Sequence, residues 1–342
     1  MISIEEIRKL LLDSNKPLFM FDDDVDGLCS YLLLKRFAKK GNFVTIKSTP
    51  RLSTVFTNKV LETNPDKVFI LDKPMIDQEF VDSINASIIW IDHHEPQKDI
   101  FGVKYFNPRI LDDNDNRPTT YWCYKIVQQD EWIALAGILS DWHMPEFAEA
   151  FSKEHPDLLP QSEDKLKALF DSKMGTLIRM LAFSLKGRTT EVSHNIRSLE
   201  LIESPFEILD VSTKNGKRIY DHFQEINKHY EKVLKDAIKK AGKEKVLLYT
   251  YPSTKHSFTG NLSNELIYRF PDKVIIIGRE KEENVVLSFR SANIELPQLI
   301  NKALEGLEGY GGGHKFACGG NIKKSDFYEF MNRFRELIKQ SQ

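Results

Sequence analysis

The first half of the chain alternates between short apolar runs and stretches in which apolar residues recur at helical spacing. Four of the apolar runs are rich in β-branched and aromatic residues and have the length of buried strands. They lie at 17–21, 43–46, 67–71 and 86–91. Near-continuous apolar strands separated by helices, such as the one expected at 28–39, are typical of a parallel sheet covered on both faces. The pattern therefore predicts an α/β domain built on a parallel sheet.

The middle of the chain shows no strand pattern. Residues from about 143 to 212 have the pattern of helices throughout, with Ser162 and Ser172 as candidate caps. The charged, amphipathic stretch at 220–241 predicts one long helix that ends at Gly242. This helix either connects two domains or packs wholly on one of them.

Apolar runs typical of strands return after Gly242, at 245–250, 273–278 and 285–290. The changes of pattern predict three parts of the chain. These are an N-terminal parallel-sheet domain (1–212) that includes the helical segment (143–212), a connecting helix (213–242) and a smaller α/β C-terminal domain (243–342).

Composition and charge exclude several classes of protein. The 342 residues are 41% hydrophobic and 29% charged, an ordinary globular balance that excludes a disordered or fibrous chain. A formal net charge of -2 excludes a protein held on duplex DNA by charge alone, although a local basic groove remains compatible with it. The cysteines Cys29, Cys123 and Cys318 form no metal or disulfide pattern, which favours a reducing compartment. With no apolar run near the roughly 20 residues of a membrane span and no signal-peptide pattern, we expect a soluble, cytoplasmic protein.

Acidic residues follow the first predicted strand directly, in the run Asp22-Asp23-Asp24-Val25-Asp26-Gly27. A calcium loop of the EF-hand type is excluded, because its twelfth position would be Leu33 and a strand precedes it where a helix is needed. Taken alone, the run fits either a solvated turn that caps the next helix or a carboxylate cluster that holds divalent metal ions.

Three further acidic positions favour the metal cluster. Asp72 and Asp92 each follow an apolar strand, and Asp141 follows an apolar helix. His93 and His94 come directly after Asp92. Because ligands collect at the carboxyl ends of parallel strands, we expect these side chains to meet at one edge of the sheet. Carboxylate and imidazole ligands without a thiolate suit Mn²⁺ best and Mg²⁺ next. Two such ions would reduce the repulsion between the acids. They would also support phosphoester hydrolysis.

Four features follow one another along the chain: DDDVDG, Asp72, the triplet Asp92-His93-His94, and GILSD ending at Asp141. In this order they resemble the four motifs of the DHH phosphoesterase family. Near the C-terminus, GGGHKFACGG, with the run Ser288-Phe289-Arg290-Ser291 upstream, resembles the associated C-terminal domain of the RecJ and nanoRNase branch. The helical segment at 143–212 is most similar to that of archaeal RecJ-like members. The resemblance covers most of the chain and implies the DHH architecture.

The resemblance implies a role for each matching residue of the N-terminal motifs. The implied metal ligands, with Asp72 bridging two ions, are Asp22, Asp24, Asp72, His93 and Asp141. Asp92 and His94 take catalytic positions beside the ions, where they orient ligands and the attacked phosphate. Asp26 is expected to stabilise the tight turn at Gly27. Several members have a histidine shortly before the first aspartate as a further ligand, and this chain has Met20 there.

The C-terminal motif implies a site for a phosphate or a terminal nucleotide. The residues expected there are Arg290, Gly311, Gly312, Gly313 and His314. The glycines let backbone N–H groups approach an anion closely, and an arginine can bind phosphate through two hydrogen bonds. Asn107 and Arg109 either line the substrate cleft or belong to an ordinary turn.

The implied activity is that of a manganese-dependent phosphodiesterase with two ions, Mg²⁺ being the alternative metal. It would hydrolyse single-stranded RNA or DNA or short oligonucleotides from one end to nucleoside monophosphates. A phosphatase for 3′-phosphoadenosine 5′-phosphate and a cyclic dinucleotide phosphodiesterase are alternatives, as is a non-catalytic replication or repair scaffold. Because the chain ends in one amphipathic helix soon after GGGH and has little positive charge, we expect a preference for short oligonucleotides. A second copy of the chain and a replisome protein are the possible protein partners.

Overall fold

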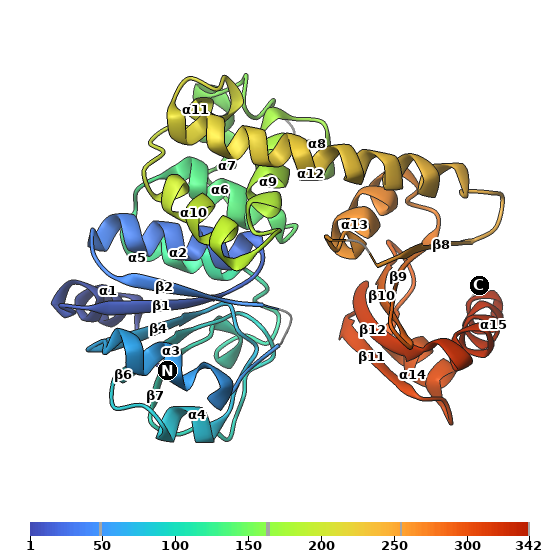
Figure 1. Ribbon diagram of the computed structural model, residues 1–342, viewed down its shortest axis with the longest axis horizontal. Helices are drawn as coiled ribbons and strands as arrows, with labels where there is room; N and C mark the ends of the chain where they lie inside the picture. Colours follow the sequence, from blue (N-terminus) through green and yellow to red (C-terminus); the bar gives the residue numbers. More distant parts are fainter. Residues whose placement is uncertain (48–49, 162–164, 254, 341–342) are drawn as a thin grey trace. The chain divides into compact units, whose positions relative to one another are not determined.

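The computed structural model describes residues 1–47, 50–161, 165–253 and 255–340, and the chain forms two compact units, Met1–Asp221 and His222–Gln342 (Figure 1). The first unit is built on a five-stranded sheet in the order β2-β1-β4-β6-β7, in which every neighbouring pair is parallel. Its strands are β1 (Pro17–Asp22), β2 (Asn42–Ile46), β4 (Lys67–Leu71), β6 (Ser87–Ile91) and β7 (Val103–Phe106). The predicted parallel sheet is confirmed.

The edge strand β7 is the member of this sheet that the hydrophobic pattern did not predict. Its sequence, VKYF, mixes polar and apolar residues, and only Phe106 is buried. A separate two-stranded parallel sheet pairs β3 (Arg51–Leu52) with β5 (Met75–Ile76). Such short or half-buried strands lack the continuous apolar run by which the central strands were found.

Helices cover both faces of the five-stranded sheet (Figure 1). The face that carries Met20 packs against residues of α3 and α4. The opposite face packs against α2, where the rings of Phe21 and Tyr31 stack with their centroids 4.7 Å apart. The helices of this part are α1 (Ile4–Asp13), α2 (Val25–Ala38), α3 (Thr57–Thr63), α4 (Gln78–Asp82), α5 (Thr119–Val127) and α6 (Glu131–Ser140), with short 3₁₀ turns η1 (Thr54–Phe56) and η2 (Pro108–Ile110).

The segment at 143–212 contains helices and no strand among its described residues, as predicted. The helices are α7 (Ala148–Glu154), α8 (Lys165–Phe170), α9 (Lys173–Ser184), α10 (Thr189–Glu200) and α11 (Phe206–Leu209). Ser172 is the N-cap of α9, where its hydroxyl accepts a hydrogen bond from the Gly175 amide. The other predicted cap, Ser162, lies outside the described residues.

The long charged helix α12 (Lys214–Lys239) begins before the amphipathic run at 220–241 and lies within the connecting segment expected at 213–242, and the division between the two units falls inside it. In its C-terminal half, Tyr230 contacts Phe258 and donates a hydrogen bond to Glu265, both in the second unit. Although α12 has 26 residues, no helix in the described part of the chain combines the length and apolar character that a membrane span requires.

The second unit is a smaller five-stranded sheet in the order β11-β12-β10-β9-β8, with β8 parallel to β9 and the other pairs antiparallel. One face packs against α14 and α15 through Phe289, Phe330 and Phe334. Its elements are β8 (Val246–Pro252), α13 (Thr259–Arg269), β9 (Val274–Lys281), β10 (Asn284–Arg290), α14 (Pro297–Leu304), β11 (Gly309–His314), β12 (Ala317–Lys323) and α15 (Lys324–Gln340). The smaller α/β domain predicted after Gly242 is confirmed in its fold class.

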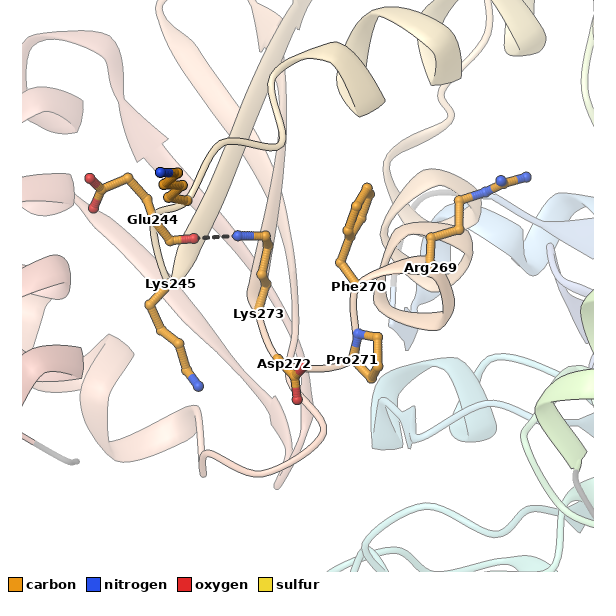
Figure 2. Close-up of a pocket in the computed structure, with 8 residues that line it drawn as sticks. Glu244, Lys245, Arg269, Phe270, Pro271, Asp272 and Lys273 are labelled. Carbon is orange, nitrogen blue, oxygen red and sulfur yellow. Dashed lines mark hydrogen bonds between the residues drawn. The ribbon is translucent and has the colours of Figure 1, made fainter.

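The second unit also contains a cavity of about 340 Å³ between the residues before β8 and the turn that leads from α13 into β9 (Figure 2). Residues 243–245 and 269–273 line it. The Lys273 Nζ donates hydrogen bonds to the carbonyls of Gly242 and Glu244, which holds the two segments together. None of the residues predicted to bind metal or substrate lines this cavity.

Candidate metal centre

Three parallel strands deliver their acidic residues to the same edge of the first sheet. Phe21 of β1 pairs with Leu71 of β4, and Leu71 pairs with Ile91 of β6. The residues one step further along, Asp22, Asp72 and Asp92, therefore emerge side by side at the carboxyl ends of the strands. Asp72 has a left-handed backbone conformation with φ of 57°, which aspartate and asparagine tolerate better than most residues do.

The run DDDVDG passes from β1 into α2 through a close approach that only glycine permits. Asp24 is the N-cap of α2, and its side chain accepts a hydrogen bond from the Gly27 amide at 2.9 Å. A Cβ atom at Gly27 would lie 2.6 Å from the Asp22 carbonyl oxygen. The cap and the glycine together fix where Asp22 and Asp24 present their carboxylates.

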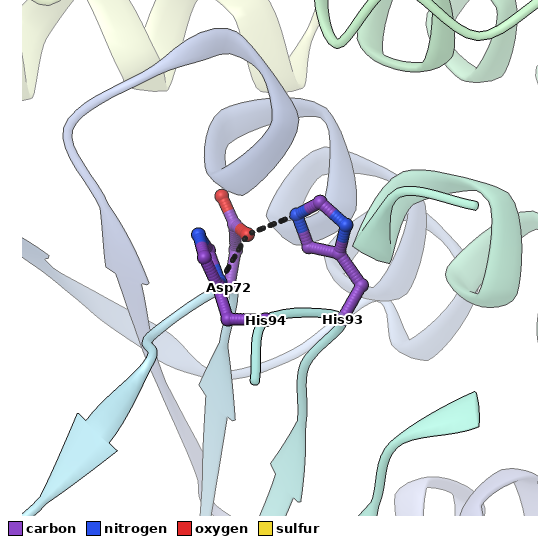
Figure 3. Close-up of side chains that lie close together, drawn as sticks. All are labelled: Asp72, His93 and His94. Carbon is purple, nitrogen blue, oxygen red and sulfur yellow. Dashed lines mark ion pairs between the residues drawn. The ribbon is translucent and has the colours of Figure 1, made fainter. Parts of the chain in front are cut away.

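Three carboxylates converge on one imidazole nitrogen. The Nε2 atom of His93 lies 3.3 Å from Asp141 Oδ2, 3.4 Å from Asp72 Oδ1 and 3.8 Å from Asp26 Oδ2. In Figure 3, the Asp72 carboxylate lies between the rings of His93 and His94. Asp72 also forms a second group with Asp22 and Asp24, and one ligand atom from each of the three lies within 4.8 Å of the others. The structure thus brings together all five predicted ligands.

Asp26 joins this centre, although it was expected only to stabilise its own turn. Its carboxylate accepts hydrogen bonds from the amides of Thr119 and Thr120, at 2.9 and 2.7 Å, and so caps the start of α5. The side chain is buried, and it forms a possible ligand group with His93 and Asp141. The position of Asp26 as a fourth acid, two positions after Asp24, was the only sign of this in the sequence.

Asp92 and Asn107 position His94. Asp92 is fully buried, and its Oδ1 lies 2.8 Å from the Nδ1 atom of His94 while its Oδ2 accepts a bond from the His94 amide. Asn107 is also buried and donates to Asp92 and to the His94 carbonyl. The structure therefore places Asn107 in support of the centre, whereas Arg109 forms an ion pair with Glu95, 2.9 Å away.

Burial and mutual repulsion disfavour the ionised form of buried acids in this centre. Burial raises the pKa of Asp72 well above its usual range, and the charge of Asp26 raises it further. Burial alone would lower the pKa of His94, but the hydrogen bond and charge of Asp92 outweigh it and raise this pKa to about 9. The centre therefore favours added positive charge.

The arrangement fits a divalent metal ion. Its donors are carboxylate oxygens and imidazole nitrogens, which suit Mn²⁺ and Mg²⁺. Neighbouring ligand atoms around an octahedral ion lie about 3 Å apart, because each metal–ligand distance is about 2.1 Å. The contacts of His93 Nε2 with Asp72 and Asp141 are already close to that spacing. Met20 supplies no ligand, since it is buried among apolar side chains.

Comparison with known families agrees with these motifs. Residues 18–156 match the DHH family, N-terminal domain, and residues 244–340 match the DHHA1 domain. The chain belongs to the DHH family of phosphoesterases. By sequence, no curated protein is similar enough to count as a match.

Solved structures with the same fold extend over nearly the whole of this DHH chain. RecJ from Thermus thermophilus in complex with Mn²⁺ has a TM-score of 0.71 at 15% identity and covers 98% of this chain. This chain spans only 55% of the length of the Thermus thermophilus RecJ chain. Exonuclease RecJ bound to manganese has a TM-score of 0.59 at 15% identity, with 98% and 94% of the two chains covered. The DHH domain of a protein described as a member of a ribosomal-protein family gives 0.67 at 15% identity, with 97% and 88% covered.

The residues of this DHH protein that were predicted to bind phosphate lie at one end of the second sheet. Arg290 ends β10, where its Nε donates to Asn264 Oδ1 at 2.7 Å and its Nη1 donates to Ser288 Oγ at 3.1 Å. The register pairs Arg290 with Ala317, and Ala317 with His314. Arg290 and His314 therefore lie two strands apart on the same sheet edge.

The glycine cluster differs from its expected form. Gly311, Gly312 and Gly313 were expected to leave their backbone N–H groups open to an anion, but they belong to strand β11 and pair with β12. Because β11 is an edge strand, only one of its sides pairs with another strand. The glycines can therefore offer backbone groups to a ligand on the outer side alone.

Proposed function

We propose that this protein is a divalent-metal phosphodiesterase that releases nucleoside monophosphates from one end of single-stranded nucleic acid, with short oligonucleotides as its preferred substrates. The observation that carries the proposal is the convergence of Asp72, Asp141 and Asp26 on His93 Nε2, within 3.3–3.8 Å. Two structures of the same fold are named as RecJ bound to manganese, one of them as an exonuclease, which supports the choice of metal and substrate class.

The residues of the first unit would divide the work of metal binding and orientation. Asp72, His93 and Asp141, together with Asp22 and Asp24, would hold the ions. Bound divalent ions supply an activated water at neutral pH and neutralise charge on the phosphate. Asp92 acts through His94: by binding Nδ1 it fixes the ring, so that Nε2 is the nitrogen that His94 presents to a phosphate oxygen.

The residues at the edge of the second sheet would bind the substrate. Arg290 is held in one orientation by Asn264 and Ser288, so little rotational freedom is lost when its guanidinium binds a phosphate. Gly312 leaves open space where a side chain would otherwise stand, which lets a phosphate or a base approach the backbone. His314 is exposed beside them.

The test is digestion of RNA and DNA oligomers from two to about thirty nucleotides, labelled at either end, with Mn²⁺, Mg²⁺ or EDTA. We expect mononucleotide release that requires the metal, starts at one end, and is most efficient on the shortest oligomers. Efficiency that rises with length would indicate a nuclease for long strands. Release of inorganic phosphate from 3′-phosphoadenosine 5′-phosphate, or opening of a cyclic dinucleotide, with no action on linear oligomers would contradict the proposal.

A further inference from the structure

One residue of the centre was not anticipated from the motifs: Lys73, which follows Asp72 directly. Its side chain is fully buried, and its Nζ lies 2.8 Å from Asp22 Oδ1. Its backbone carbonyl accepts a hydrogen bond from Trp90 Nε1 at 2.9 Å, which fixes the main chain at this point. Lysines are almost never fully buried unless an acid pairs with them. Lys73 is therefore a built-in cation of the centre.

This ion pair limits what Asp22 can offer to a metal. Asp22 Oδ1 also accepts a hydrogen bond from the Asp23 amide, at 2.9 Å. A carboxylate oxygen has two lone pairs, so the Lys73 ammonium and the Asp23 amide together saturate Oδ1. Only Oδ2 remains for an ion, and Met20 on the same strand adds no ligand. The position formed by Asp22, Asp24 and Asp72 is thus poor in donors and lies beside a positive charge.

The position around His93 has more donor atoms, and in the described part of the chain no lysine is paired with the acids that only this position uses. It combines an imidazole nitrogen with the carboxylates of Asp72 and Asp141 at 3.4 and 3.3 Å, and Asp26 lies close by. Among the described residues, no lysine or arginine forms an ion pair with any of these three aspartates. His94 Nδ1 lies 3.8 Å from Asp72 Oδ1, but Asp72 belongs to both positions, so His94 does not distinguish them. An ion there therefore meets more donors and no fixed ammonium group paired with its ligands.

We propose that Lys73 makes the two metal positions unequal. The resting protein holds one divalent ion tightly at Asp72, His93 and Asp141, and the position at Asp22 and Asp24 binds a second ion weakly because the Lys73 ammonium already neutralises Asp22. This inference rests on the proposed metal-dependent function, but it is tested by metal binding in the absence of substrate.

The experiment is a calorimetric titration of the metal-free full-length chain with Mn²⁺. For the wild type we expect one tight site and a second site at least about tenfold weaker, because like charges repel strongly at this range. Lys73→Met removes the ammonium and retains a long apolar side chain, so the second site should tighten by about tenfold or more. Lys98→Met, at an exposed lysine, is the matched control and should leave both sites unchanged.

A second variant keeps the inference falsifiable if Lys73→Met does not fold. Asp22→Asn should remove the weak site and leave the tight site within about threefold of the wild type. Two equally tight sites in the wild type, an unchanged second site in a folded Lys73→Met, or loss of the tight site in Asp22→Asn would each overturn the inference. No Mn²⁺ binding at all would instead overturn the proposed function along with it.

Discussion

The two sheet edges that carry the candidate chemistry are built in opposite ways. At the edge of the first sheet, three of the functional acids also stabilise the fold, since Asp24 caps α2, Asp26 caps α5 and Asp92 holds His94. At the edge of the second sheet, the chemistry depends on small residues, and Gly312 leaves space open. The acids of the first edge are thus fixed by hydrogen bonds to the fold, whereas the proposed substrate edge combines one held side chain, Arg290, with glycines that leave space open.

The difference has an electrostatic consequence. The first edge crowds buried acids together and raises the pKa of Asp72 by burial and by the charge of Asp26. On the second edge, Arg290 has neutral oxygen partners in Asn264 and Ser288, so no comparable repulsion is built in. The first edge should therefore reduce the stability of the metal-free protein, and the second should not.

The largest expected effect follows from removing the shared charge of the first edge. Asp72→Asn should reduce hydrolysis by about 10³-fold, the upper end of what one electrostatic group contributes to catalysis. Because burial disfavours the ionised carboxylate in the folded state, the same variant should melt about 2–4 °C higher than wild type in EDTA. Asparagine also tolerates the left-handed backbone at this position. Activity assays and thermal unfolding in EDTA measure the two effects.

Asp99→Asn, at an exposed aspartate, is the control and should change neither quantity. A metal-free Asp72→Asn that melts below wild type would show that the acids of the first edge are not in electrostatic conflict.

A smaller effect is expected from Asp92, which acts through His94. The hydrogen bond and charge of Asp92 overcome the effect of burial and raise the pKa of His94 to about 9. His94 therefore stabilises the metal-free fold below its unfolded pKa of about 6.5, and this contribution is lost as the pH rises from about 6.5 to about 9. In Asp92→Asn the pKa of His94 should fall toward 6.5, and the stability of the metal-free fold should depend less on pH. Activity should drop by about 10–100-fold.

The NMR titration of His94 in the metal-free protein checks this directly. A wild-type His94 that titrates at its ordinary value would mean that Asp92 does not hold the charged ring.

The smallest expected effect distinguishes two neighbouring glycines of the second edge. A Cβ atom at Gly312 would meet no atom within 4 Å, so Gly312→Ala should change the free energy of unfolding by less than about 0.5 kcal/mol. It should nevertheless weaken oligonucleotide binding about threefold, because it occupies the space open to the ligand. Gly313 has φ of 143°, and a Cβ atom there would lie 2.7 Å from the Ala317 carbonyl, so Gly313→Ala should destabilise the protein itself.

Chemical denaturation and oligonucleotide binding measured on both variants separate the two cases. Unchanged oligonucleotide binding in a fully stable Gly312→Ala would show that β11 does not contact the oligonucleotide.

The sequence predicted those features that depend on neighbouring residues. The strands ending at Asp22, Asp72 and Asp92 were found because each is a continuous apolar run, and parallel pairing then requires the acids to meet. The capping role of Asp26 was missed because its partner amide on Thr119 lies 93 residues away. The glycine strand β11 was missed because glycine has no strand preference of its own, and pairing with β12 decides its conformation.

The most direct test of the division between the two edges is the ratio of activities on two substrates: an oligonucleotide and a small chromogenic phosphodiester that carries no nucleoside. Asp72→Asn should lose activity on both, because hydrolysis is proposed to take place at the first edge. Arg290→Ala should lose at least about tenfold on the oligonucleotide, mainly through a higher KM, and retain full activity on the small phosphodiester. Equal losses on both substrates in Arg290→Ala would contradict the assignment of substrate binding to the second edge.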